Sequence, residues 1–140
     1  MARDWHDLHH RDAFDALSFI QDEIHDDNRH WWRDLGEVLD VLPQEHHEKV
    51  IGWFRAAKIA LIHSEVSEML EGVRKGLVDD HLPDRLMEEV EGADVAIRLL
   101  DFAGGSAWDL AGAMEEKLEY NQRRVDHKKE ARDADGGKKF

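Results

Sequence analysis

The stretch IHSEVSEMLEG, residues 62–72, decides the fold of this chain. Its apolar residues recur at helical spacing, and the pattern extends on both sides. We therefore predict a long helix over about 45–75 that ends at Gly76. At about 100° per residue, Glu65 falls inside the apolar stripe of this helix and Glu68 falls at its edge. Because a buried carboxylate is costly unless it is paired or bound to metal, these acids require a positive partner.

A second acid pair with the same spacing lies on the next expected helix, residues 84–103. Glu91 and Asp94 stand three residues apart on a polar line, flanked by Met87 and Val95. Acids at this spacing repel each other, so they too favour a bound cation. A single ExxE motif is more often part of a solvated helix face. The coincidence of two pairs on consecutive helices is what indicates a metal site.

The rest of the chain predicts two further helices and polar ends. We find no β pattern and no internal repeat, so we expect an all-α fold with four main helices in a single domain of residues 1–140. Before the long helix we expect a loose arm over about 1–11, a helix over about 12–28 and a connection over 29–46 that is broken at Pro43. After residue 103 we expect a helix that starts at the N-cap Ser106, has Asp109 in its first turn and ends at about 124–128. A mobile tail over about 129–140 follows it.

Composition excludes several classes of function. The net charge is −13, so the overall field of the protein does not attract nucleic acid or an anionic membrane, and we expect no direct binding to either. The chain has no cysteine, which rules out disulfides and thiolate metal ligands. No apolar run is long enough for a signal peptide or a membrane span. We expect a soluble protein of the cytoplasm.

The last expected helix changes character along one face. Leu110 and Met114 suit packing, whereas Lys117, Asn121 and Arg124 continue the same face with polar and basic groups. Such a face suits a helix that packs first and then passes over a ligand rich in phosphate. The alternative is that the basic residues merely complement the helix dipole.

Four carboxylates without cysteine and without an HExxH motif favour a hard cation, Mg²⁺ or Mn²⁺. The competing site in helical bundles is a di-iron centre, which takes Glu-x-x-His from two helices. None of the ten histidines has a glutamate three residues before it, so di-iron is disfavoured, and zinc hydrolysis is disfavoured for similar reasons.

With these motifs the chain resembles the MazG-like all-α nucleoside triphosphate pyrophosphohydrolases, a family with phage-encoded members. The resemblance lies in ExxE at 65–68, ExxD at 91–94 and the closing KLEYNQRRVDHK at 117–128 with its GGKKF end. It covers residues 54–140. Residues 1–50 are less recognisable and are expected to carry much of the base selectivity.

The resemblance implies hydrolysis of a (deoxy)nucleoside triphosphate to the monophosphate and pyrophosphate. It also implies Mg²⁺ as the cofactor, with Mn²⁺ able to substitute, and assembly as a homodimer or homotetramer in the cytoplasm, which is the host's if the gene is phage-borne. The base stays open among dGTP or GTP, dCTP and dUTP. The metal ligands would be Glu65, Glu68, Glu91 and Asp94, with Glu68 favoured as the residue that orients or deprotonates the attacking water.

The same resemblance assigns the substrate contacts. Lys58, Lys117 and Arg124 would bind phosphate oxygens, and Asn121 would bind sugar or phosphate. The candidates for the base pocket are Asn28, Trp31 and Trp32, although the two tryptophans suit a core or a subunit contact equally well.

Two other classes of function stay open. One is a non-catalytic nucleotide-binding or regulatory bundle that keeps the fold, and the other is an acidic structural oligomer whose carboxylates are only surface. For the enzyme, Gly136-Gly137 followed by Lys138 and Lys139 suggests a tail that orders over the bound nucleotide as a lid.

Overall fold

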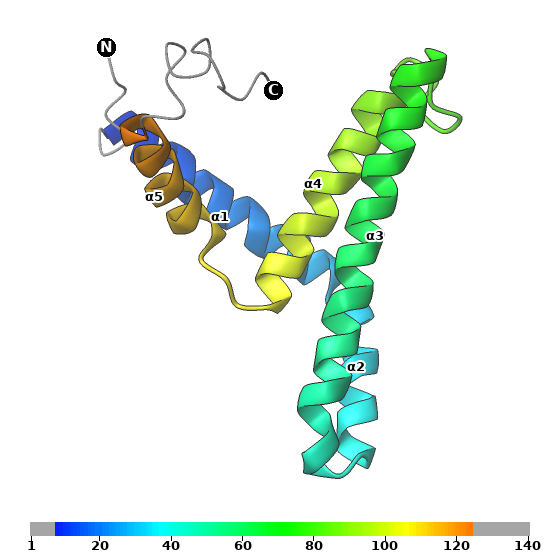
Figure 1. Ribbon diagram of the computed structural model, residues 1–140, viewed down its shortest axis with the longest axis vertical. Helices are drawn as coiled ribbons and strands as arrows, with labels where there is room; N and C mark the ends of the chain where they lie inside the picture. Colours follow the sequence, from blue (N-terminus) through cyan, green and yellow to red (C-terminus); the bar gives the residue numbers. More distant parts are fainter. Residues whose placement is uncertain (1–7, 125–140) are drawn as a thin grey trace, which may run out of the picture. The chain divides into compact units, whose positions relative to one another are not determined.

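The computed structural model describes residues 8–124, and every helix or strand assigned in this part of the chain is a helix, which confirms the all-α prediction (Figure 1). None of the helices in the described range has the length and apolarity that a membrane span requires. The elements are α1 (Leu8–Asn28), α2 (His30–Val41), the short 3-10 helix η1 (Gln44–His46), α3 (His47–Lys75), α4 (Met87–Gly105) and α5 (Leu110–Arg123).

The helices divide into two compact units. Unit 1 contains the first half of α1 together with α5, and unit 2 runs from Ile20 to Trp108. In unit 1 the N-cap of α5 is Asp109, whose Oδ1 accepts the N–H of Gly112 at 2.9 Å. The prediction of Ser106 as the cap is wrong. The chain first turns through Ala107 in a left-handed conformation, which delays the start of the helix.

The sequence failed to predict α2 and the early start of α1. Residues 30–41 are helical because Trp32, Leu35 and Leu39 recur at helical spacing and are half-buried. Pro43 only ends this helix, since the preceding Leu42 is extended, as expected before a proline. The described part of α1 begins at residue 8, inside the segment expected to be a loose arm.

Helices α3 and α4 lie side by side as an antiparallel hairpin, green and yellow in Figure 1. The predicted stop at Gly76 is confirmed, since this residue caps α3 with a φ of 60°. An isolated bridge between Val78 and Leu86 closes the connecting loop. This bridge keeps Leu86 extended, so α4 begins three residues later than predicted.

The two helices of the hairpin approach closely at Gly72. A Cβ atom at this position would lie 3.0 Å from the backbone nitrogen of Glu88 and 3.2 Å from Cβ of Met87. We therefore expect Gly72→Ala to lower the free energy of unfolding by about 1–3 kcal/mol. Gly52→Ala on the same helix should raise it by about 0.5–1 kcal/mol, because nothing lies within 4 Å of that Cβ. Urea unfolding of both variants compares them, and equal stabilities would argue against the close approach.

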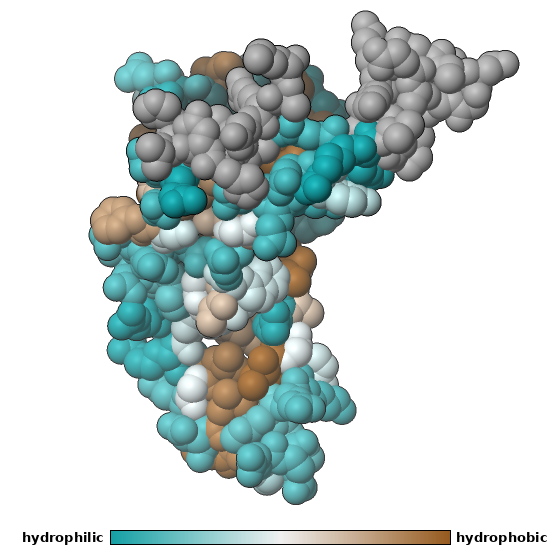
Figure 2. All heavy atoms as spheres, turned by 90° about the vertical axis from the view of Figure 1, so that its left-hand side faces the viewer, coloured by the Kyte–Doolittle hydropathy of each residue, from teal (hydrophilic) through white to brown (hydrophobic). Residues whose placement is uncertain are grey.

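Little of the apolar surface is covered within either unit. Among residues 11–124 the buried apolar side chains are Phe102 and Ala103 in unit 2 and Ala111 in unit 1. By contrast Val41 is 81% exposed and Trp53 is 62% exposed. Figure 2 shows apolar side chains, in brown, gathered toward the lower end of the molecule, where α2 and the start of α3 lie.

Candidate metal centre

Three of the four predicted metal ligands converge on the α3–α4 hairpin. Glu65 of α3 and Glu91 and Asp94 of α4 each offer a carboxylate oxygen, and these oxygens lie within 4.8 Å of one another. Glu65 and Glu91 are buried, and Asp94 is half-buried. The antiparallel packing of the two helices brings these acids face to face. We call Glu65, Glu91 and Asp94 the acid cluster.

Glu68, the fourth predicted ligand, lies beside the acid cluster rather than in it. Its side chain is exposed, one turn along α3 from Glu65. It nevertheless lines a cavity that the acid cluster also borders; we call this space, which has a volume of about 470 Å³, the acid cavity. The residues around this cavity are Glu65, Glu68, Asp79, His81, Leu82, Val90, Glu91, Asp94 and Arg98.

The crowding of these acids is visible in the electrostatics of Glu91. Burial raises the pKa of Glu91 above its ordinary value of 4.5, and the hydrogen bond with Glu65 raises it further. The charges of Glu68 and Asp94 act in the same direction. A bound cation would relieve this repulsion. Carboxylate oxygens are the donors that Mg²⁺ and Mn²⁺ prefer, so the acid cluster fits the predicted cofactor.

The raised pKa of Glu91 predicts how the metal-free protein responds to pH. The folded chain takes up a proton at Glu91 more readily than the unfolded chain does. The contribution of Glu91 to stability should therefore rise as the pH falls from neutral through its raised pKa toward 4.5. Urea unfolding at about pH 7 and about pH 5 in the presence of a chelator measures this effect. Glu91→Gln should show a smaller gain on acidification than the wild type, and an equal gain would contradict the assignment.

Arg98 is a basic residue that forms an ion pair with the acid cluster. Its Nε atom lies 2.9 Å from Oε1 of Glu65. The N–H does not point well at this oxygen, so the contact is an ion pair rather than a hydrogen bond. Arg98 also lines a second cavity. The guanidinium of Arg98 therefore borders both the acid cluster and this second cavity.

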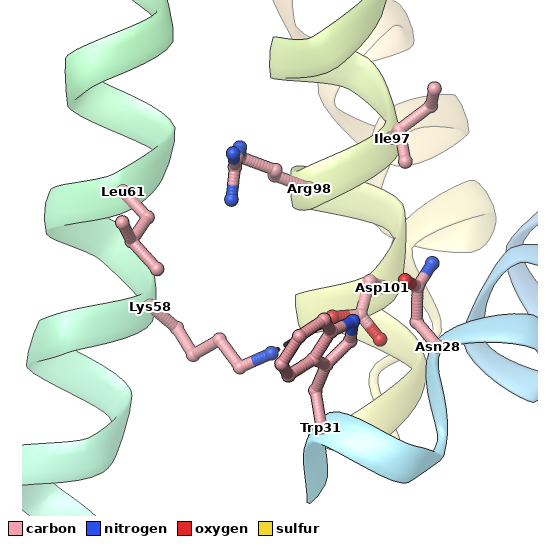
Figure 3. A pocket seen from close by; sticks show the side chains of 7 residues that line it. All are labelled: Asn28, Trp31, Lys58, Leu61, Ile97, Arg98 and Asp101. Carbon is pink, nitrogen blue, oxygen red and sulfur yellow. Dashed lines mark hydrogen bonds and ion pairs between the residues drawn. The ribbon is translucent and has the colours of Figure 1, made fainter.

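This second cavity, the side pocket, has a volume of about 450 Å³. Figure 3 shows the side chains that line it, which come from α1, α2, α3 and α4. Two of the predicted base-pocket residues, Asn28 and Trp31, lie on its wall, and so does the predicted phosphate ligand Lys58. The residues that line it are Asn28, Trp31, Lys58, Leu61, Ile97, Arg98 and Asp101.

Asp101 is a buried carboxylate that gathers groups from three other helices. The Nζ atom of Lys58 lies 3.1 Å from Oδ2 of Asp101. The indole N–H of Trp32 donates to Oδ1 at 2.8 Å, and Nδ1 of His25 lies 3.0 Å from the same oxygen. Trp32 packs against Phe54 and does not line the side pocket. Of the two predicted tryptophans, the structure therefore places Trp31 at the pocket and Trp32 in the supporting core.

The predicted C-terminal phosphate ligands are in unit 1, whereas the acid cluster is in unit 2. The Nζ atom of Lys117 on α5 lies 4.7 Å from the ring centroid of Tyr120, and the guanidinium of Arg124, the residue that follows α5, lies 5.7 Å from it. Asn121 is half-buried on the same helix. Their approach to the acid cluster stays a prediction. The tail of residues 129–140 and its lid lie outside the described residues.

The sequence did not indicate the role of Asp79 or the polar contacts that Asp101 makes. Asp79 is buried, and its Oδ1 accepts the backbone N–H groups of His81 and Leu82, which shapes the loop beside the acid cluster. An aspartate two and three residues before those N–H groups is a recognisable turn signal. Asp101 stood on the polar line of α4, but nothing local indicated His25 as its partner.

Comparisons with known proteins do not place the chain: no protein-family model, curated protein or solved structure matches it. The resemblance to the MazG-like family thus rests on the motifs at 65–68 and 91–94 and stays a prediction.

Proposed function

We propose that this chain is a metal-dependent nucleotide pyrophosphohydrolase of the MazG-like kind. It would convert a (deoxy)nucleoside triphosphate to the monophosphate and pyrophosphate, with Mg²⁺ as the cofactor and Mn²⁺ as a substitute. The observation that carries the proposal is the convergence of Glu65, Glu91 and Asp94 within 4.8 Å, on the wall of a cavity that shares Arg98 with the side pocket. A nucleoside triphosphate has a group for each cavity, because its phosphates can bind the metal and its base can enter the side pocket.

The acids divide the chemical work by their positions. Glu65, Glu91 and Asp94 would hold the cation, which when bound would neutralise phosphate charge and lower the pKa of an attacking water. Glu68 is exposed to the same cavity and stands outside the acid cluster. Its carboxylate is therefore free to orient that water and accept its proton.

The side pocket supplies the features that a nucleobase needs. Trp31 is 58% exposed and offers a ring for stacking. Asn28 donates one N–H to the carbonyl of Ile24, which leaves its amide oxygen to accept from the base. Lys58, on the same wall, would contact phosphate or base through its remaining N–H groups. From the sequence, Lys117, Asn121 and Arg124 stay the predicted further phosphate ligands.

We also propose that the protein assembles as a homodimer or homotetramer. The support is the apolar surface that the units leave uncovered, above all around Val41 and Trp53. Sedimentation equilibrium measures the assembly directly. Val41→Asp together with Trp53→Ser should shift the chain toward the monomer, and a wild-type chain that sediments as a monomer would contradict the proposal.

The direct test of the activity is a pyrophosphate-release assay with Mg²⁺ and each of the common ribo- and deoxynucleoside triphosphates. We expect equal amounts of monophosphate and pyrophosphate from one or a few nucleotides, and none in the presence of a chelator. Binding of a nucleotide without release of pyrophosphate would favour the non-catalytic nucleotide-binding bundle. Glu91→Gln, purified in parallel, excludes a contaminating hydrolase.

A further inference from the structure

Arg98 holds an unusual position for a basic residue. It is the single lysine or arginine among the described residues that line the acid cavity, and its ion pair with Glu65 is the one ion pair it makes in the described part of the chain. Glu65 is 9% exposed at its side chain, whereas Arg98 is 42% exposed. One partner is therefore held in place by burial, and the other has room to move.

The space available to Arg98 extends in two directions. Figure 3 shows its side chain leaving α4 and reaching toward α3 above Lys58 and Leu61. From this position the guanidinium borders both the acid cavity and the side pocket. A change of rotamer can therefore carry the charge from one cavity toward the other without any movement of the helices.

We propose that Arg98 is a further substrate-binding residue, which balances the acid cluster when metal is absent and binds a phosphate oxygen of the substrate once metal has taken Glu65. This inference rests on the proposed function. A divalent cation and a guanidinium that share the carboxylate of Glu65 repel each other at short range, so binding of the cation weakens the ion pair between Glu65 and Arg98. The cation, with its higher charge and three carboxylates, is the stronger partner of the acid cluster.

Once metal is bound, the charge of Arg98 is balanced better by the phosphates of the substrate than by groups of the protein. Lys58, the other cation of the side pocket, is already balanced by Asp101 at 3.1 Å. Because metal binding weakens the pairing of Arg98 with Glu65, Arg98 is the less balanced of the two positive charges beside the bound triphosphate. Its planar guanidinium can donate two parallel hydrogen bonds to phosphate oxygens.

Binding measurements with Mn²⁺ and a non-hydrolysable nucleotide analogue test this exchange without relying on turnover. Because Arg98→Gln removes a competitor of the metal, we expect it to tighten Mn²⁺ binding in the absence of nucleotide by about fivefold or more. The same variant should weaken binding of the analogue at saturating Mn²⁺ by about tenfold or more. Arg85→Gln is the matched control, since it removes an exposed arginine of the same unit that pairs with Glu89. It should change neither affinity more than about twofold.

The outcomes separate this inference from the proposed function. If Arg98→Gln weakens Mn²⁺ binding or leaves it unchanged, Arg98 only orients Glu65 and the exchange is overturned, while the metal site stands. Equal effects of Arg98→Gln and Arg85→Gln would also overturn it, because they would reflect net charge alone. A wild-type chain that binds no Mn²⁺ would contradict the proposed function as well. If Arg98→Gln does not fold, Arg98→Lys takes its place. This variant keeps the positive charge but loses the two parallel N–H donors of the guanidinium, so it must still weaken binding of the analogue.

Discussion

Replacing Glu65 or Glu91 by glutamine, or Asp94 by asparagine, is expected to lower kcat/KM for pyrophosphate release by about 100-fold or more. Each change removes a charged oxygen from the acid cluster, whose ligand atoms lie within 4.8 Å of one another. Mn²⁺ affinity should fall in parallel, because fewer carboxylates remain to hold the cation. Steady-state kinetics and titration calorimetry with Mn²⁺ measure the two effects.

Controls for these variants lie on the same two helices. Glu71→Gln on α3 and Glu89→Gln on α4 make the same chemical change at residues that pair with Lys75 and Arg85 instead of facing the acid cluster. They should leave turnover and Mn²⁺ binding unaltered. A loss at Glu71 as large as that at Glu65 would mean that the active face of α3 has been assigned incorrectly.

Glu68→Gln should separate catalysis from metal binding. Because Glu68 lies outside the acid cluster, Mn²⁺ affinity should change little while kcat falls strongly. Loss of Mn²⁺ binding equal to that of Glu91→Gln would make Glu68 a metal ligand instead of the residue that handles the water.

The second large effect is expected for stability. Asp101→Ala should lower the free energy of unfolding by about 3–5 kcal/mol, because it leaves the ammonium of Lys58 buried without its counter-ion. The side chain of Lys58 is only 16% exposed and lies against the rings of Trp32 and Phe54, which cannot replace a carboxylate. Urea unfolding at a fixed protein concentration measures the loss, since self-association would otherwise shift the apparent value.

Two further variants show whether the unpaired charge causes this loss. Lys58→Met in the Asp101→Ala background removes the stranded ammonium and should recover part of the stability. Asp34→Ala, at an exposed position of α2, should stay within about 0.5 kcal/mol of the wild type. If the double variant were as unstable as the sum of its single changes, the ion pair would not be the source of the effect.

The local sequence pattern was sufficient to predict the long helices and to select three of the acids as candidate metal ligands. The apolar period around Glu65 and the glycine at position 76 determine α3 and its end, because helix periodicity and the left-handed cap are properties of neighbouring residues. The same period places Glu91 and Asp94 on one side of α4. Helix α2 is not evident from the local pattern, because Pro43 suggests a break in a segment that it only ends.

The sequence by itself determined which residues share a face of a helix, and from this the acid motifs and the all-α class. It could not determine which face meets which across a distance of many residues. The tertiary structure alone decided that Trp31 lines the side pocket while Trp32 supports Asp101, and that Arg98 pairs with Glu65. The physical reason is that spacing along a helix is set by local hydrogen bonds, whereas partners between helices are chosen by packing, which depends on the whole unit at once.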